Sequence, residues 1–164
     1  MPRLLATLSL ALVVAGTAAA QESARFHHAH VNAVDPQKSV EWYQKFFSAV
    51  PVTYNDAVPG VFVDRSFILF KKVEEQAPWK LEQGIYHLGW GGVDGPSDFK
   101  WRDEQGVKWE TPLSTLGTNY FMYAYGPDKE LVENWTGYRN HRFVDVRLFV
   151  DEINANKNWY MKNL

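Results

Sequence analysis

The sequence predicts an α+β fold built from two paired βαβββ modules, and two observations lead to that prediction. The first is a repeat, because "HAHVNAVDPQKSVEW" (28–42) and "HLGWGGVDGPSDFKW" (87–101) both read H-x5-V-D-x6-W without a gap. The second is that each copy starts with strand-like residues, continues with helix signals and is followed by three short strand-like runs. A repeat of this length indicates one supersecondary unit used twice.

The first module covers about residues 25–75. It opens with a strand, in which Phe26, His28, His30 and Asn32 alternate with the residues between them. A helix follows, with Asp35 as N-cap and Pro36 at its first position, where a missing N–H costs nothing. Its apolar stripe, Val40, Tyr43 and Phe47, is placed to pack on a sheet. Three strands are then expected at 52–55, 60–65 and 66–73.

The second module covers about residues 84–137 and repeats this order. We expect a strand at 85–93, a short helix at 95–105 and strands at 107–114, 119–125 and 130–137. The turn "GPDK" at 126–129, with proline at its second position, joins the last two strands. A charged segment interrupted by Pro78 links the modules.

The repeat also predicts a metal site. His28 and His30 share one face of their strand, whereas His27 takes the other. His28 has a counterpart in His87, so the two histidines could meet across a cavity between related modules. Glu133 lies between Leu131 and Trp135 in an apolar strand, where its charge is expensive unless something compensates it. Two imidazoles and one carboxylate form a facial triad for a divalent metal, although each histidine could instead be a hydrogen-bonded structural residue.

The sequence assigns less specific roles to the other polar residues near this triad. His30 could support the ligands or carry a proton, or could simply be a polar wall residue. Tyr123 and Tyr125 could also support the ligands. Glu130, close to the turn, is expected to face solvent.

These residues resemble the vicinal oxygen chelate superfamily, which includes glyoxalase I, bleomycin-resistance proteins and extradiol dioxygenases. His28 with the following helix resembles its opening, and "GPDKELVE" (126–133) resembles its closing turn and ligand strand. The resemblance covers about residues 25–137 within an expected domain at 21–140. It implies two βαβββ modules forming a half-barrel with a metal-binding cavity, and His28, His87 and Glu133 as ligands. Leu69 stands where glyoxalase I-like members carry a second acidic ligand, and Gly126 and Lys129 replace the usual aspartate and glycine of the turn.

Two functions are compatible with this resemblance. One is a metal-dependent enzyme, of dioxygenase or lyase type, whose small substrate chelates a single divalent ion (iron, manganese, nickel or zinc) through neighbouring oxygens. The other is a non-catalytic module that binds a small ligand. In that reading "GWGG" (89–92) leaves room for a bulky molecule, and Trp90 and Trp135 stack on it.

The N-terminus predicts export. Residues 1–20 combine a basic start, the apolar run 4–16 and small residues at Ala18 and Ala20, as in a secretory signal peptide. We therefore expect a periplasmic or secreted protein that stays off the membrane after cleavage. The chain has no cysteine, which excludes disulfides and thiolate chemistry. Its 17 basic and 19 acidic residues form no basic patch, which argues against nucleic acid as a partner.

The sequence of residues 141–164 predicts either the start of a third module or a C-terminal extension. In this comparison Phe143 matches Phe26, Asp145 falls at the His28 position, and "WYMKNL" (159–164) matches "WYQKFF" (42–47). We expect a strand and a helix without the sheet that should follow, completed by docking, by a homodimer or by a further domain. We also expect residues 143–164 to pack less well than 26–137 and to contribute no metal ligand.

Overall fold

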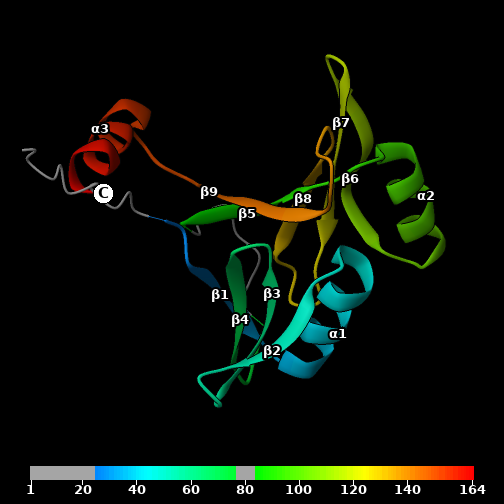
Figure 1. Ribbon diagram of the computed structural model, residues 1–164, viewed down its shortest axis with the longest axis horizontal. Coiled ribbons are helices and arrows are strands. Elements are labelled where there is room, and N and C mark those ends of the chain that lie inside the picture. The colour runs from blue at the N-terminus through cyan, green and yellow to red at the C-terminus, as the bar shows by residue number, and fades with distance from the viewer. Residues whose placement is uncertain (1–24, 77–83) are drawn as a thin grey trace, which may run out of the picture.

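The computed structural model describes residues 25–76 and 84–164, and within them it confirms the two βαβββ modules (Figure 1). The predicted signal peptide lies outside the described residues. Within the described ranges, no helix has the length and apolar character needed to cross a membrane.

The first module forms a four-stranded sheet, called here the first sheet, with the order β1-β4-β3-β2. β1 runs parallel to β4, and the other pairs are antiparallel. Its elements are β1 (His28–Ala33), α1 (Pro36–Phe47), β2 (Val50–Tyr54), β3 (Val58–Val63) and β4 (Ser66–Lys72).

The second module repeats this order in the second sheet, β6-β7-β8-β5-β9, with one strand added at the edge of β5. Its elements are β5 (Ile85–Gly91), α2 (Gly95–Glu104), β6 (Lys108–Leu116), β7 (Asn119–Tyr125) and β8 (Leu131–Trp135). The extra strand is β9 (Arg142–Leu148), and α3 (Ile153–Asn163) follows it.

The two modules share the same strand register. His30 of β1 pairs with Leu69 of β4, and Gly89 of β5 pairs with Glu133 of β8. Because His30 and Gly89 each lie two residues after the repeated histidine, Leu69 and Glu133 occupy equivalent positions. This equivalence agrees with the place that the sequence analysis gave Leu69 in the comparison with glyoxalase I-like members.

Helix α1 forms where predicted and connects the modules. The side chain of Asp35 accepts a hydrogen bond from the Lys38 amide, and Ser48 ends the helix in the left-handed conformation. The buried stripe of α1 packs on the first sheet and also meets the second, since the rings of Phe47 and Trp90 are 4.9 Å apart. The apolar core is consequently continuous between the modules. Trp90 is 1% exposed within this core, so its ring is a packing residue and not the ligand-stacking residue that we had considered.

The turn between β7 and β8 docks on the N-terminal end of α1. The carboxylate of Asp128 accepts hydrogen bonds from the Val34 amide (2.8 Å) and the Ser39 hydroxyl (2.9 Å). A negative charge at this end of a helix is favoured by the helix dipole. Lys129 adopts a φ of 66° in the same turn, the left-handed conformation that glycine usually supplies.

Glu130 does not face solvent, contrary to expectation. It accepts a hydrogen bond from the Tyr43 hydroxyl at 2.9 Å, and burial raises its pKa to about 7. The side chain folds back over Gly126, where an added Cβ would lie 2.1 Å from Glu130 Oε1. Glycine in place of the aspartate usual at this turn position thus makes room for the half-buried Glu130 side chain.

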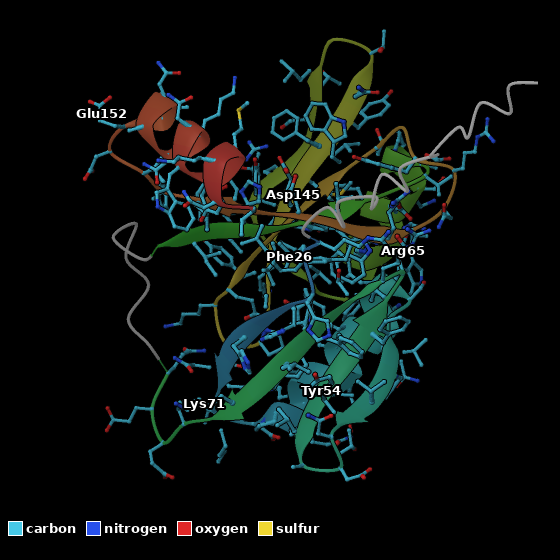
Figure 2. The ribbon with its side chains drawn as sticks, turned by 60° about the vertical axis from the view of Figure 1, so that its left-hand side comes forward. Phe26, Tyr54, Arg65, Lys71, Asp145 and Glu152 are labelled. Carbon is cyan, nitrogen blue, oxygen red and sulfur yellow. The ribbon has the colours of Figure 1, made fainter. Side chains whose placement is uncertain are left out.

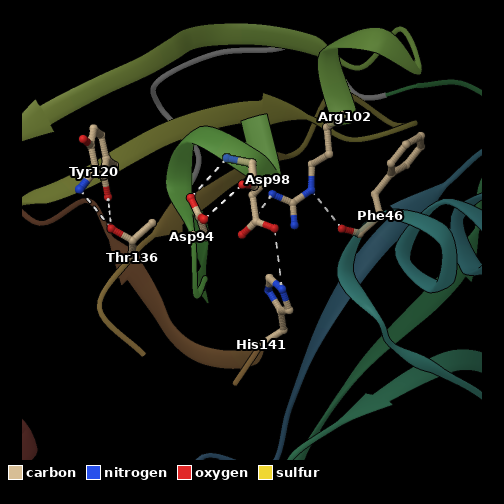
Figure 3. A network of polar contacts seen from close by, with 8 residues as sticks. Phe46, Asp94, Asp98, Arg102, Tyr120, Thr136 and His141 are labelled. Carbon is tan, nitrogen blue, oxygen red and sulfur yellow. Dashed lines mark hydrogen bonds and ion pairs between the residues drawn. The ribbon is translucent and has the colours of Figure 1, made fainter. Parts of the chain in front are cut away.

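Helix α2 adds a second contact between the modules (Figure 3). Arg102 is 2% exposed, and its Nε donates to the carbonyl of Phe46 at 2.9 Å, near the C-terminal end of α1. Its guanidinium lies over the Phe47 ring, 4.6 Å from the centroid, and 4.0 Å from Asp98. Burial lowers the pKa of Arg102, which Asp98 partly offsets.

The C-terminal strand and helix differ in how they pack. β9 pairs antiparallel with β5 and buries Phe143, which is 6% exposed. α3 extends beyond β9, away from α1 and α2, and has no buried residue (Figure 1). The expectation of poorer packing therefore fits α3 but not β9.

Candidate metal and ligand site

The face of the second sheet opposite Trp90 and α1 brings candidate site residues into one row. Across neighbouring strands, Tyr123 of β7 pairs with Glu133 of β8, Glu133 with Gly89 of β5, and Gly89 with Asp145 of β9. His87, two residues before Gly89, points to the same face because strand side chains alternate.

His87 and Glu133 meet, as the sequence analysis proposed. His87 Nε2 lies 3.2 Å from Glu133 Oε2, and the two residues are 1% and 7% exposed. Neither ring nitrogen of His87 has a well-directed hydrogen bond in the described part of the chain. A buried imidazole with unused nitrogens beside a carboxylate is a donor set that suits a divalent metal ion.

Tyr123 holds the other carboxylate oxygen. Its hydroxyl donates to Glu133 Oε1 at 2.6 Å. Burial, together with this hydrogen bond, raises the pKa of Tyr123, so that the phenol stays protonated and acts as a donor. Burial would raise the pKa of Glu133 too, but the contacts with His87 and Tyr123 and the charge of Arg147 together lower it.

His28 lies elsewhere. It is exposed on β1, its Nδ1 is 2.8 Å from His27 Nδ1, and its ring centroid is 4.8 Å from that of His30. Partial burial and the neighbouring His30 and His27 lower its pKa. Among residues 25–76 and 84–164, no three histidine, cysteine, aspartate or glutamate side chains form a group that could hold a metal. The structure thus brings together two members of the predicted triad and leaves out His28.

His30 borders a small cavity between the sheets that also reaches His87. The cavity has a volume of about 140 Å³, and its lining includes His30, Asn32, Tyr86, His87 and Glu130. His30 therefore lines this cavity as a wall residue, and its role as a supporting residue or proton carrier stays a prediction.

This face also includes Asp145 and Arg147 of β9, which the sequence analysis did not select as site residues. Asp145 and Arg147 border a cavity of about 240 Å³ together with Glu133, Trp135 and Tyr138. Figure 2 shows Asp145 on β9, above Phe26 at the start of the first sheet. Asp145 Oδ1 is buried without a partner among the described residues, and Arg147 is exposed at the edge. Asp145 could have been selected from the sequence, because it aligns with His28 when residues 143–164 are compared with the first module.

The comparisons with known proteins identify the fold. No family model matches the chain, and no curated protein matches its sequence. Among solved structures, a glyoxalase/dioxygenase from Nostoc punctiforme matches 81% of this chain and 100% of its own, with a TM-score of 0.59 and 16% identity. The fold is glyoxalase-like.

Two further structures agree with this assignment. A glyoxalase/bleomycin resistance protein/dioxygenase from Alicyclobacillus acidocaldarius covers 71% of this chain and 92% of its own, with a TM-score of 0.52 and 14% identity. An integron cassette protein from V. cholerae covers 71% of this chain and 98% of its own, with a TM-score of 0.56 and 16% identity. At these identities the likeness establishes the glyoxalase-like fold alone.

Proposed function

We propose that this chain is a metal-dependent enzyme of the glyoxalase and dioxygenase type, acting on a small substrate that binds the ion through two neighbouring oxygens. The observation that carries this proposal is the buried pair of His87 and Glu133, 3.2 Å apart, in which both imidazole nitrogens lack a directed hydrogen bond. His87 and Glu133 would hold the ion, and Tyr123 would orient Glu133. A bound divalent ion would supply a Lewis acid that polarises the substrate oxygens.

The charges near the pair favour an anionic substrate once the ion is present. Glu133 and Asp145 carry two negative charges and Arg147 one positive charge, and all three border the same cavity. A divalent ion would change the local sum from about −1 to about +1. Arg147, exposed at the rim, is then placed to attract and orient a substrate with an ionised oxygen.

Metal binding can be tested without knowing the substrate. We expect purified wild-type protein to take up one equivalent of Mn²⁺, Fe²⁺, Ni²⁺ or Zn²⁺, measured by elemental analysis and calorimetry. His87→Ala and Glu133→Gln should lose this uptake, whereas His141→Ala, outside the pair, should retain it. A wild-type protein that binds none of the four ions would refute the proposal. A positive result would justify a screen of catechols and α-hydroxy carbonyl compounds.

The alternative is a non-catalytic binding module. It is favoured by the cavity beside Trp135, whose ring is stacked on Phe121 at 6.1 Å and 18°. A planar ligand could extend such a stack. In this case the metal-free protein would bind an aromatic ligand, with quenching of Trp135 fluorescence that Trp135→Phe abolishes, and it would turn nothing over.

A further inference from the structure

We infer that two copies of this chain associate through β9, which pairs antiparallel with β9 of a second copy and joins the second sheets of both copies into one. Asp145 of each copy then lies opposite Arg147 of the other, at the rim of the cavity that Glu133 borders. Association through β9 requires neither a metal nor the proposed activity. Four observations support it: an open strand edge, the charges along that edge, an unpartnered carboxylate and the position of α3.

The outer side of β9 is open for pairing. β9 ends the second sheet, and among the described strands only β5 pairs with it. Edge strands present unpaired backbone N–H and C=O groups, which proteins often block with proline. The edge strands β2 and β6 contain Pro51 and Pro112, whereas β9 contains no proline. The remaining edge strand, β1, borders the small cavity beside His87. β9 is therefore the edge best suited to pairing with another chain.

The charges of β9 select one register for this pairing. Residues 145–147 pair with β5 without irregularity, so Asp145 and Arg147 share one face of the sheet. A twofold axis perpendicular to the sheet and passing through Val146 sets Asp145 of each copy opposite Arg147 of the other. Moving the axis by one residue sets either Asp145 or Arg147 opposite its own copy. Opposite charges on paired residues stabilise a sheet and like charges destabilise it, so the register centred on Val146 is favoured.

The same register brings apolar residues of the two copies together. Val144 of each copy lies opposite Leu148 of the other, and both side chains are 39% exposed in the single chain. Phe149, the next residue, is also exposed. Pairing of the two strands would remove part of this apolar surface from water, which favours association.

Asp145 lacks a partner that the second copy supplies. Its Oδ1 is buried and has no hydrogen-bond partner among the described residues, whereas Arg147 is exposed at the edge. Directly opposite residues of antiparallel strands have Cβ atoms about 5 Å apart, within reach of an arginine side chain. The guanidinium of the second copy can therefore contact the Asp145 carboxylate where it lies, over Gly89. Charge-assisted contacts of this kind are among the stronger hydrogen bonds.

Helix α3 gains a neighbour in the paired arrangement. It follows β9, extends away from α1 and α2, and has no buried residue (Figure 1). Its apolar side chains Ile153, Trp159 and Met161 are all exposed. Because the two β9 strands run antiparallel, the end of each strand lies beside the start of the other, and α3 emerges next to the body of the second copy. Exposed apolar side chains at that place fit a contact surface between two copies.

The first test follows the molecular mass of the purified protein by sedimentation equilibrium over a range of concentrations. We expect wild type to dimerise, and Asp145→Arg and Arg147→Asp each to weaken the dimer by about 10-fold or more, because each sets like charges opposite one another twice. The double variant Asp145→Arg/Arg147→Asp restores opposite charges in the same register and should dimerise like wild type. Lys108→Glu, a charge reversal on the edge strand β6, is the matched control and should leave the dimer unchanged. Circular dichroism and thermal melts establish that each variant is folded.

A mixture of the two single variants gives a second test. Asp145→Arg carries two positive charges on this face of β9, and Arg147→Asp carries two negative charges. We expect each variant alone to be mainly monomeric and the mixture to form a heterodimer, detected by capture through an affinity tag on one of them.

Three results would overturn this inference. A wild type that stays monomeric at its highest soluble concentration leaves the edge of β9 to another occupant. A dimer that both single variants retain has its interface elsewhere. A dimer that neither the double variant nor the mixture restores does not use the pairing of Asp145 with Arg147. Metal uptake, which tests the proposed function, is measured separately and decides none of these results.

Discussion

The first strands of the two modules occupy equivalent positions but have opposite environments. β5 lies between β8 and β9, and its His87 is 1% exposed. Within residues 25–76 and 84–164, β1 pairs only with β4, and its His28 is exposed. The difference does not come from the repeated residues, which are the same, but from the neighbour that each strand acquires. The burial of the repeated histidine therefore depends on whether a further strand pairs with the edge of its own strand.

The largest expected effect concerns Leu69 and Glu133, which hold equivalent positions. Leu69 is 2% exposed, and we expect Leu69→Glu to destabilise the protein by about 4 kcal/mol because burying a carboxylate costs more than the exposed imidazole of its strand partner His30 can offset. Glu133→Leu should destabilise the metal-free protein by less, about 2 kcal/mol, because it leaves His87 and the Tyr123 hydroxyl without their partner but buries no unpaired charge. Urea denaturation measures both, with Leu116→Glu, at a site that is 62% exposed, as the control. Similar costs for Leu69→Glu and Glu133→Leu would show that the two positions are not as different as described.

A smaller effect separates β9 from α3. Phe143 is 6% exposed and contacts both Trp90 and Phe26, at 5.9 and 5.5 Å between ring centroids. We expect Phe143→Ala to cost about 3 kcal/mol through the cavity it leaves. Trp159 of α3 is 56% exposed, and Trp159→Ala should cost at most about 0.5 kcal/mol. Thermal unfolding of a dilute monomer checks both, and a large loss for Trp159→Ala would show that α3 packs on the body.

The smallest effect is a pH dependence of the contact between the modules. The pKa of Glu130 is about 7 in the folded protein, above its ordinary value near 4.5, so the folded state binds this proton more tightly. Stability should therefore fall as the pH rises from about 5 to about 8, by roughly 2 kcal/mol after allowing for the partial exposure of the group. The lowered pKa values of Glu133 and His28 act in the opposite direction to the raised pKa of Glu130. Each of them costs stability as the pH falls, below about pH 4.5 for Glu133 and below about pH 6.5 for His28.

The contribution of Glu130 is obtained by comparing unfolding free energies of wild type and Glu130→Gln across this range. The variant should lack the decline with rising pH that wild type shows. Parallel curves for the two proteins would mean that Glu130 does not titrate in this window.

Much of the fold could be predicted from the sequence because its signals are local. The repeat, the Asp35 cap with Pro36 and the apolar stripe around Tyr43 each act within a few residues, and the structure confirms the elements that they predicted. The register of β4 and β8 was also accessible, since the turns before the two strands fix the alignment of Leu69 with Glu133.

The site was less accessible because it depends on contacts between distant segments. His87 and Glu133 meet because β5 pairs with β8, a pairing that the sequence analysis did not specify. The separation of His28 from them and the arrival of Asp145 depend on which strand takes the free edge of β5, and no local pattern specifies that choice. Glu130 was misplaced for a related reason, since the hydrogen bond that it accepts from the Tyr43 hydroxyl joins residues 87 positions apart.

The docking of the Asp128 turn on α1 has a consequence for how the protein folds. Its hydrogen bonds from Val34 and Ser39 close loops of 94 and 89 residues, whereas the Asp35 cap of the same helix closes within three. Loop closure of that length costs chain entropy before the contact returns any energy, and contacts of high sequence separation slow folding. Helix α1 can thus form early from its own residues. Its N-terminal end receives its most distant partners only after the chain has reached and arranged the β7–β8 hairpin, so assembly of this end marks a late step on the folding pathway.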